Sequence, residues 1–443
     1  MLKTFKIGGI HPAENKLSAH KPIEVLPLPK TVTIMVAQHI GAPSKVIVNR
    51  GDMVRVGQIV AQSSGFVSTN IHSSVSGKVA KVDTVVDASG YKKDAIVINV
   101  EGDEWMETID RSTDLKTTFD FDIKTIIDKI LAAGIVGLGG ATFPTHVKLS
   151  PPPGMKAEVL LINGVECEPY LTADHRLMLE KGDELMVGTQ ILMKALNVNR
   201  AVIGIENNKP DAIQYLSELA KKYSGIEICQ LKVQYPQGGE KQLIKAVTGR
   251  EVPSGALPIA VGAVVNNVGT ALATYEAVIK NKPLIERIIT VTGKTLKNPS
   301  NFLVRIGTPV SELIEAAGGL PDDTAKVISG GPMMGKAIPN LEVAVTKGTS
   351  GILLISEAEG HRKPVQNCIR CGRCVTVCPM GLEPFLLMTL SEKRIWDRSE
   401  NEKVMDCIEC GSCSYSCPAN RPLLDHIRYS KLTVGGIIRN RKS

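Results

Sequence analysis

The sequence is poor in aromatic residues and in long apolar runs, and these absences exclude several kinds of protein. Aromatic side chains make up 4% of the 443 residues, and no stretch of 18 apolar residues occurs. We therefore expect no transmembrane helix in the chain itself. The start, MLKTFKIGGIHPAENK, lacks the apolar core of a signal peptide. No G-x-S-x-G, P-loop or H-E-x-x-H motif is present, so hydrolase and nucleoside-triphosphatase functions have no support.

The chain is rich in cysteine near its end, where two identical frames occur. CIRCGRCVTVCP and CIECGSCSYSCP each hold four cysteines at C-x2-C-x2-C-x3-C, followed by proline. Three thiolates at this spacing wrap one face of a [4Fe–4S] cubane, and the fourth leaves the loop. Zinc sites instead typically combine two separated C-x2-4-C pairs. The frames therefore predict two [4Fe–4S] clusters, in a reducing compartment where thiolates survive.

The fourth cysteine of each frame decides how the ligands are shared. In two-cluster ferredoxins this cysteine binds the other cluster. That exchange predicts two ligand sets: Cys368, Cys371, Cys374 and Cys417 for one cluster, and Cys407, Cys410, Cys413 and Cys378 for the other. The 28 residues between the frames contain PFLLMTLSEKRIW, which is typical of a helix with an apolar stripe. A compact ferredoxin has a shorter link, so an α-helical ferredoxin variant, with the exchange left open, is the alternative.

The net charge of +7 lies mostly in this cysteine-rich region. From residue 361 onward, 14 lysine and arginine residues stand against 8 acidic residues. An oxidised cubane with four thiolates carries about −2, so two clusters would bring the region close to neutral. The basic residues therefore fit compensation of the clusters, and we expect no nucleic-acid partner.

The chain changes periodicity along its length, which predicts four domains: residues 1–115, 116–284, 285–360 and 361–443. In the first, VNRGDMVRVGQIVA and IHSSVSGKV alternate apolar and polar residues. This pattern resembles the flattened barrel of biotinyl and lipoyl carriers, a barrel-sandwich hybrid. The hairpin tip near Ser68, Thr69 and Asn70 lacks the carrier lysine, so we expect it to serve in packing or docking.

The two middle regions predict an α/β domain followed by a β module. Residues 116–284 combine the helical segment DIKTIIDKILAAGIV with EVLLINGVE, an apolar run typical of a buried parallel strand. Residues 285–360 give strand, turn, strand and a short helix opened by Thr308 and Pro309. That order resembles a β-grasp module of the soluble-ligand-binding (SLBB) type. The run SGGPMMG at 329–335 is predicted to be a loop.

A glycine-rich loop and three polar turns make the α/β region the candidate binding site. In GIVGLGGATFPTHVKL, Gly137, Gly139 and Gly140 allow backbone N–H groups to approach an anionic ligand, and Lys148 adds positive charge. Taken alone, such a loop could equally be a tight structural turn. NGVECEPY follows a predicted strand at the edge where open α/β sheets bind ligands. YPQGGEKQL and NNVGTALATYEAV are further polar turns of this region.

In this order, the loop GLGGATFPTHVK and the turns NGVECEP, YPQGGE and NNVGT resemble the flavin-binding subunit of respiratory complex I. The whole order of modules, ending in two cubane frames, is similar to the family of C subunits of the Rnf complexes. Those complexes are membrane ferredoxin:NAD oxidoreductases coupled to ion translocation. The resemblance covers essentially the full length of the chain.

The resemblance implies an FMN site beside a site for NAD(H). Contacts with the FMN phosphate or the adjacent dinucleotide would come from Gly137, Gly139, Gly140 and Lys148. The flavin would be held by Asn163, Glu166, Asn266 and Asn267. Gly238 and Gly239 of the YPQGGE turn are further candidates for cofactor binding. Phe143 would stack near the nicotinamide, and Glu168 and Glu240 would bind NAD(H). No side chain is assigned a catalytic role, because the flavin ring supplies the chemistry.

The chain also departs from the complex I pattern. Leu138 and Thr142 stand where the complex I loop carries an arginine and a further glycine, and His146 replaces another glycine. Two alternatives therefore stay open: a subunit of a soluble, bifurcating flavin and iron–sulfur enzyme, and an iron–sulfur relay whose flavin domain is empty.

The function that the resemblance implies is electron transfer between NAD(H) and partner subunits. NAD(H) would exchange a hydride with FMN, and single electrons would pass through the two [4Fe–4S] clusters. The expected partners are integral membrane and iron–sulfur subunits, and ferredoxin directly or through one of them. We expect the protein at the cytoplasmic face of the membrane, held there peripherally.

Overall fold

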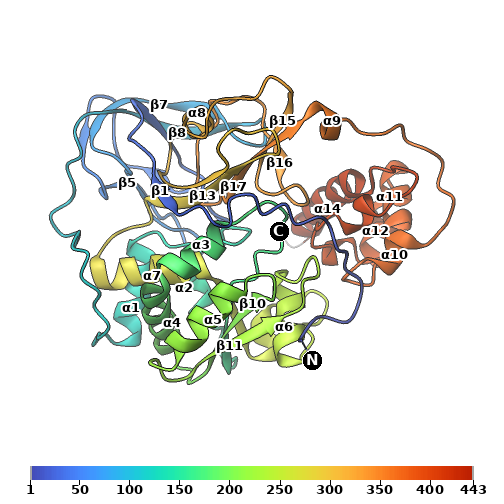
Figure 1. The fold of residues 1–443 in the computed structure, drawn as a ribbon, viewed down its shortest axis with the longest axis horizontal. Helices are drawn as coiled ribbons and strands as arrows, with labels where there is room; N and C mark the ends of the chain where they lie inside the picture. The colour runs from blue at the N-terminus through green and yellow to red at the C-terminus, as the bar shows by residue number, and fades with distance from the viewer. Residues whose placement is uncertain (1, 442–443) are drawn as a thin grey trace.

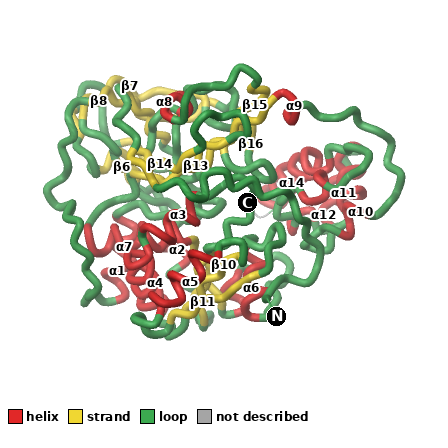
Figure 2. Tube along the Cα trace, in the orientation of Figure 1, coloured by secondary structure: helices red, strands yellow, loops and turns green. Residues whose placement is uncertain are grey.

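The computed structural model describes residues 2–441. Two regions rich in strands lie on one side of the molecule, and the α/β region lies on the other (Figure 1). The C-terminal helices stand to one side of both, and Figure 2 shows that this part is built of helices and loops. The predicted combination of a barrel-sandwich hybrid, a flavin-subunit-like α/β domain, a β-grasp module and a two-cluster domain is confirmed.

The barrel-sandwich region consists of two antiparallel sheets. The first has the order β2 (Thr31–Met35), β8 (Lys92–Val100), β7 (Gly77–Val86), β4 (Met53–Val54). The second has the order β3 (Lys45–Val46), β5 (Ile59–Gln62), β6 (Ile71–His72). Alternate side chains of these strands, such as Ile34, Ile71 and Ile96, are buried in a shared core, as the period of two requires.

The hairpin tip of this region, residues 63–70, packs against the α/β region. Thr69 Oγ1 donates to the carbonyl of Leu131 over 3.3 Å, and Asn70 Nδ2 donates to that of Ala132 over 3.2 Å. Both carbonyls lie at the end of α1 (Ile123–Ala132). The tip that carries a lysine in biotinyl and lipoyl carriers is thus an interdomain contact here.

The α/β region is built on a four-stranded parallel sheet with the order β11-β10-β9-β12. Its strands are β9 (Val159–Asn163), β10 (Ala201–Glu206), β11 (Ile226–Leu231) and β12 (Ala263–Asn267). The helices are α1, α2 (Thr145–Lys148), α3 (Ala173–Glu180), α4 (Gly182–Leu196), α5 (Pro210–Ala220), α6 (Glu240–Thr248), α7 (Val268–Lys280) and the 3-10 turn η1 (Pro258–Val261). Because β10 and β12 flank β9 on opposite sides, the strand order reverses between β9 and β12.

The β-grasp region forms a mixed six-stranded sheet with the order β1-β14-β13-β17-β15-β16. Its elements are β13 (Glu286–Thr292), β14 (Ser300–Arg305), α8 (Val310–Ala316), β15 (Thr324–Ser329), β16 (Lys336–Ala337), β17 (Gly351–Ser356) and α9 (Glu357–Gly360). The predicted strand, turn, strand and short helix are present, and residues 330–335 contain no regular element. The edge strand β1 (Ile23–Val25) comes from the start of the chain and pairs in parallel with β14.

The cysteine frames lie in a helical region, and no strand occurs in its described part, residues 361–441. Its helices are α10 (Arg373–Thr376), α11 (Pro384–Glu392), α12 (Trp396–Asn401), η2 (Val404–Asp406), α13 (Ser412–Tyr415) and α14 (Leu423–Asn440). The segment PFLLMTLSEKRIW is helical as predicted, but it is interrupted at Arg394, whose φ is +55°. Buried Leu387 and Ile427 join α11 to α14 in a core of its own.

Candidate functional site

The candidate flavin site lies at the carboxyl ends of β9 and β12, where the strand order of the parallel sheet reverses. Open α/β sheets bind ligands at such switch points, because the flanking connections leave in opposite directions. β9 ends at Asn163, and β12 ends at Asn266 and Asn267. The sequence motifs thus bring three predicted site residues to one edge of the sheet.

Two of these asparagines are held by the protein itself. Asn163 Nδ2 donates to the Gly238 carbonyl over 2.8 Å. Asn267 Oδ1 caps α7 by accepting from Gly269 N over 2.8 Å, and its Nδ2 donates to Asp174 over 2.7 Å. Burial raises the pKa of this Asp174 carboxyl to about 7. The side chains of Asn163 and Asn267 therefore fix the backbone around these two strand ends, the region that we call the crevice.

Asn266 differs from its neighbours. It is 3% exposed, and neither its amide nitrogen nor its amide oxygen has a hydrogen-bond partner among the residues described. An unpaired buried amide costs about 1–3 kcal/mol. A ligand with both acceptor and donor groups along one edge would relieve that cost, and an isoalloxazine ring carries carbonyl oxygens and an N–H in this way. The residues at this crevice therefore fit FMN.

The glycine-rich loop covers the same crevice. Leu138 N donates to Thr270 Oγ1 of α7 over 3.0 Å, which fixes the loop above the end of β12. A side chain at Gly139 would begin 3.0 Å from Asn267, whereas one at Gly140 would meet no atom within 4 Å. Gly139 thus permits close approach to the strand end, and Gly140 faces open space. Thr142 adopts a φ of +53°, a conformation that favours glycine.

Lys148 contacts both the YPQGGE turn and the end of β12. Lys148 Nζ donates to Glu240 Oε1 over 3.1 Å and to the Val265 carbonyl over 3.0 Å. Gly239 directly precedes α6, and Glu240 is its first residue. An ion pair therefore joins Lys148, just after the glycine-rich loop, to Glu240 of the YPQGGE turn. Phe143, at the end of the loop, is partly exposed.

Glu166 and Glu168 have structural partners. The Glu166 carboxylate accepts from Asp174 N and His175 N over 2.8 and 3.1 Å, at the start of α3. The Glu168 carboxylate accepts from Met334 N and Met333 N over 2.8 and 3.1 Å. Burial raises the pKa of Glu168 to about 7. Glu168 thus holds the SGGPMMG loop rather than the glycine-rich loop.

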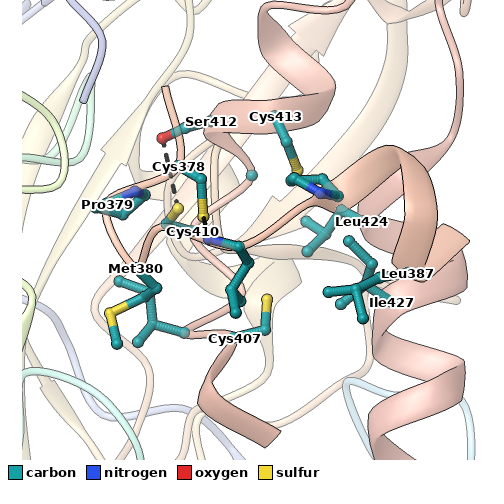
Figure 3. A pocket seen from close by; sticks show the side chains of 14 residues that line it. Cys378, Pro379, Met380, Leu387, Cys407, Cys410, Ser412, Cys413, Leu424 and Ile427 are labelled. Carbon is teal, nitrogen blue, oxygen red and sulfur yellow. Dashed lines mark hydrogen bonds between the residues drawn. The ribbon is translucent and has the colours of Figure 1, made fainter. Parts of the chain in front are cut away.

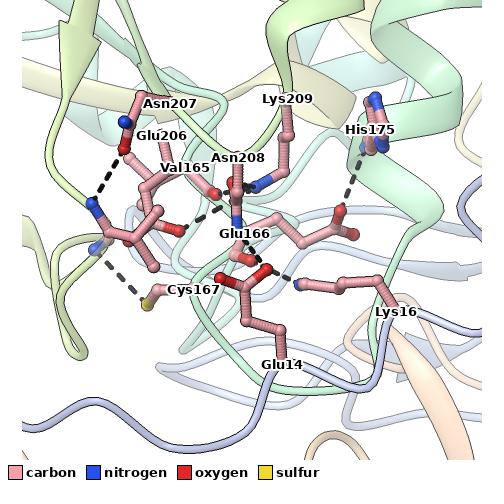
Figure 4. Close-up of polar contacts among 12 residues, drawn as sticks. Glu14, Lys16, Val165, Glu166, Cys167, His175, Glu206, Asn207, Asn208 and Lys209 are labelled. Carbon is pink, nitrogen blue, oxygen red and sulfur yellow. Dashed lines mark hydrogen bonds and ion pairs between the residues drawn. The ribbon is translucent and has the colours of Figure 1, made fainter.

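A buried charged network, which the sequence did not reveal, supports this turn (Figure 4). Lys16 Nζ donates to the carbonyls of Glu166, Glu168 and Leu171, and burial lowers its pKa. Lys209 Nζ donates to the Val165 carbonyl over 2.7 Å. Both lysines therefore fix the path of the NGVECEP turn.

The thiol of Cys167, within this turn, accepts from Gly238 N over 3.4 Å. Burial raises the pKa of Cys167, so its thiol stays protonated near neutral pH. A packed thiol of this kind is a filler between the NGVECEP and YPQGGE turns.

The eight frame cysteines form two groups. One group lines a small cavity of about 20 Å³ together with apolar side chains of α11 and α14: Cys378, Cys407, Cys410 and Cys413 (Figure 3). This is the grouping that exchange of the fourth ligand predicts, and we call it the inner set. Within residues 2–441, no group of three or more His, Cys, Asp or Glu is arranged to hold a single metal ion. A cubane, whose ligands stand further apart, fits this arrangement better than zinc.

The remaining cysteines, the outer set, lie at the surface. Cys368 and Cys371 are exposed, and Cys374 and Cys417 are partly exposed. The charges of Cys417 and Cys368 both act on the pKa of the Cys374 thiol, so these three lie near one another. Of the outer set, Cys417 lines a hollow together with Lys363, Arg373 and Tyr415 among others.

Hydrogen bonds from the α/β region and the start of the chain hold the loops that carry the inner set. Tyr235 Oη donates to the Cys410 carbonyl over 2.7 Å. Gln242 Nε2 donates to the Pro379 carbonyl over 3.2 Å, and Gly9 N donates to that of Val377 over 2.9 Å. Sequence reasoning missed all three donors, although two of them lie in or beside the YPQGGE turn. No comparable bond joins the α/β region to the outer set among the described contacts.

No helix within residues 2–441 is long and apolar enough to span a bilayer.

Family comparisons agree with this architecture. Residues 3–103 match the RnfC barrel sandwich hybrid domain, 130–276 the Nuo51 FMN-binding domain, 288–337 the SLBB domain and 362–418 a 4Fe-4S dicluster domain. A solved NAD+-reducing [NiFe]-hydrogenase chain superposes with a TM-score of 0.50 at 18% identity, over 72% of this chain and 63% of that one. This last likeness concerns the fold alone.

Curated relatives match over nearly the whole chain. The C subunit of a proton-translocating ferredoxin:NAD(+) oxidoreductase complex from Clostridium ljungdahlii is 49% identical over 97% of this chain and 94% of its own. Its Na(+)-translocating counterpart from Acetobacterium woodii is 47% identical, over 97% and 96%. The C subunit of an ion-translocating oxidoreductase complex from Rhodobacter capsulatus is 43% identical, over 87% and 75%. The chain therefore belongs to the family of C subunits of the Rnf-type ion-translocating ferredoxin:NAD(+) oxidoreductases, with an FMN-binding domain and a 4Fe-4S dicluster domain.

Proposed function

We propose that this chain is the NAD(H)-interacting subunit of a membrane-bound ferredoxin:NAD oxidoreductase complex coupled to ion translocation. Its four parts, residues 1–115, 116–284, 285–360 and 361–443, would act as a docking barrel, a flavin and NAD(H) domain, a β-grasp support and a two-cluster relay. The contact between Tyr235 and Cys410 carries this proposal, because it joins a turn of the flavin crevice to a cluster-ligand loop.

The residues around the switch-point crevice would hold FMN. Asn266 offers an unpaired buried amide to the ring, and Gly139 and Gly140 leave space for backbone approach. Gly137, Lys148, Asn163, Glu166, Gly238, Gly239 and Asn267 would complete the site as direct contacts or as the frame around them. When bound, FMN exchanges a hydride with NAD(H) and single electrons with an iron–sulfur cluster.

NAD(H) would bind at the open side of the crevice. Phe143 is partly exposed, and the Glu240 side chain is 42% exposed although it pairs with Lys148. Both can therefore reach a dinucleotide from outside. Glu168 is also proposed as a contact, but its carboxylate would first have to release the backbone of Met333 and Met334.

The inner and outer cysteine sets would hold the two [4Fe–4S] clusters in order. The inner set is bound to the α/β region by hydrogen bonds, and the outer set is exposed. Electron transfer falls off with distance, so the inner cluster would be the neighbour of the flavin site. The outer cluster would then face the partner.

The surface around the outer set suits an acidic iron–sulfur partner. Val365 and Ile369 are 54% and 69% exposed there. Exposed basic residues surround them: Arg362, Lys363, Arg370 and Arg373. Complementary charge would steer an acidic ferredoxin, or an iron–sulfur subunit acting for it, toward Cys368 and Cys371. Through such subunits the chain would be held peripherally at the cytoplasmic face of the membrane, beside integral membrane partners.

The test is an anaerobic NADH titration of the chain reconstituted with FMN, iron and sulfide, followed by visible absorption. We expect NADH to bleach both the flavin band and the broad cluster absorption. Gly139→Asp, which drives a charged side chain toward Asn267, should abolish flavin binding and this response. Gly65→Asp makes the same change where no atom lies within 4 Å, and should preserve both. If dithionite bleaches the clusters but NADH changes nothing in the flavin-loaded chain, the protein is a relay and the dehydrogenase function is wrong.

A further inference from the structure

The glycine-rich loop rests on a side chain from another domain. Arg287 lies on β13 of the β-grasp sheet and is 7% exposed. Its Nη2 donates to the Leu138 carbonyl over 3.3 Å, and its Nε donates to the Thr349 carbonyl over 3.3 Å. Because Thr270 of α7 holds the Leu138 N–H, residue 138 is fixed from both sides of its backbone.

The charge of Arg287 has no directly paired carboxylate. No carboxylate oxygen lies within 4.0 Å of its guanidinium among residues 2–441, whereas Arg305, on the neighbouring strand β14, pairs with Glu286. Burial lowers the pKa of Arg287 to about 10, which still leaves it protonated at neutral pH. Asp174 is the acidic group that acts on it, and that carboxylate is bound to Asn267. A buried cation is costly unless an anion compensates it.

A buried lysine of the same module holds the start of the loop. Lys347 is 1% exposed, and its Nζ donates to the Gly134 carbonyl over 2.7 Å and to the Asn70 carbonyl over 3.0 Å. The next residue, Gly348, faces Thr142, since a side chain there would begin 2.9 Å from its methyl group. The segment 346–349 therefore underlies the loop from its start to Thr142.

Neutral donors would satisfy these carbonyls at a smaller desolvation cost than cations do. The buried charge of Arg287 is compensated if the opposite side of the loop binds a negatively charged group, because unscreened charge acts over several ångströms in a buried site. The crevice at Asn266 and Asn267 lies on that side, and Gly269, between Asn267 and Arg287, would place a side chain 3.5 Å from Arg287 Nη1.

We propose that the β-grasp module supports the glycine-rich loop and supplies positive charge beneath it, an arrangement that we call the electrostatic platform. Arg287 is its positioning residue, and it favours bound FMN and the reduced, more negative form of FMN. This inference rests on the proposed function. Arg287 acts through the Leu138 carbonyl, which sets the loop, and through its charge, which favours electron density on the ring. The module then contributes to the flavin site without touching NAD(H).

Three variants of the reconstituted full-length chain test this platform. Arg287→Gln removes the charge and keeps a donor, Arg287→Lys keeps the charge with fewer donors, and Arg305→Gln makes the matched change on β14. Arg305 binds Glu286, Asp103 and the Ser74 carbonyl but does not touch the loop. FMN dissociation constants come from quenching of flavin fluorescence. Flavin midpoint potentials come from anaerobic redox titration, and melting temperatures report folding.

We expect Arg287→Gln to weaken FMN binding by about tenfold or more, as loss of one buried charge-assisted bond implies. Its flavin midpoint potential should fall, because the reduced form loses a nearby positive charge. Arg287→Lys should keep a potential near the native value, and Arg305→Gln should change the melting temperature alone. If Arg287→Gln binds FMN natively with an unchanged potential, or if Arg287→Lys behaves like Arg287→Gln, the platform is wrong. If the unsubstituted chain binds no FMN, the proposed function itself fails.

Discussion

The hydroxyl of Tyr235 lies 2.7 Å from the backbone carbonyl of Cys410 and donates a hydrogen bond to it. Tyr235 opens the YPQGGE turn, and three residues later the Gly238 carbonyl accepts from Asn163 at the end of β9. One short turn therefore contacts both the flavin crevice and the loop of the inner cysteine set. This continuity is the structural basis for pairing these two sites in electron transfer.

Replacing Tyr235 by Phe tests the contact. The ring remains, but the Cys410 carbonyl loses its buried donor, which should cost about 1–2 kcal/mol of the free energy of unfolding. We expect a slower NADH-driven bleaching of the clusters in stopped-flow absorption, with the amplitude of dithionite reduction unchanged. Tyr91→Phe, on a barrel side chain that is 70% exposed, is the matched control and should match the native rate. Equal rates in both variants would show that this contact has no part in the transfer.

The order of the two cysteine sets gives a second prediction. Cys410→Ser removes an inner ligand, and Cys371→Ser removes an outer one. If the inner set lies between flavin and partner, Cys371→Ser leaves one cluster that NADH can reduce, whereas in Cys410→Ser the remaining outer cluster should no longer respond to NADH. Iron content and low-temperature electron paramagnetic resonance measure both outcomes. A response of the outer cluster to NADH in Cys410→Ser would reverse the proposed order.

Periodicity and spacing predicted the large features of this chain. These features depend on residues that are close together in the sequence, because strand period, strand burial and cluster geometry act over few residues. Examples are the alternation over the barrel strands, the apolar run that ends at Asn163 and the two cysteine frames. The polar turns that follow apolar runs likewise indicated the carboxyl ends of the parallel strands. Asn163 lies there at the end of β9, and Asn266 and Asn267 lie at the end of β12.

Contacts between distant segments were not predictable in this way. In the sequence, Arg287 has the features of an ordinary strand residue. Only the packing of β13 under the glycine-rich loop brings it into contact with the proposed flavin site. Gly9 and Lys16 precede every motif, yet they hold the inner cysteine loop and the NGVECEP turn. No periodicity encodes such pairings, since they depend on how whole domains dock. The missed residues are therefore mainly those that join domains.

Replacing Asn266 should change the free energy of unfolding and the affinity for FMN in opposite directions. In the flavin-free chain its amide is buried without partners, so Asn266→Leu should raise the free energy of unfolding by about 1–3 kcal/mol. In the same variant FMN binding should weaken, because the ring loses the amide. Chemical denaturation of the flavin-free chain and fluorescence titration with FMN measure the two effects. Asn197→Leu, at the left-handed end of α4, is a control that should lower stability and leave FMN binding unchanged. A loss of stability in Asn266→Leu would show that the amide has partners of its own.

Lys347 gives a pH dependence with a defined sign. Burial lowers its pKa from an ordinary value of 10.5 to about 7 in the folded chain. Between these values the unfolded chain binds more protons, so this residue makes the free energy of unfolding rise with pH above 7, by about 1.4 kcal/mol per pH unit at most. Below pH 7 both states are protonated and the cost of burying the charge is complete.

Lys347→Met removes this titration, so the native chain should gain stability relative to the variant as pH rises from 7 to 9.5. Urea denaturation at half-unit pH steps measures the difference, and Lys93→Met, on an exposed lysine of β8, should follow the native curve. An anion bound above the loop would stabilise the protonated amine and raise its pKa. With FMN present, the same rise in stability should therefore begin at a higher pH. Parallel native and Lys347→Met curves without flavin would mean that the amine stays charged in the folded chain across this range.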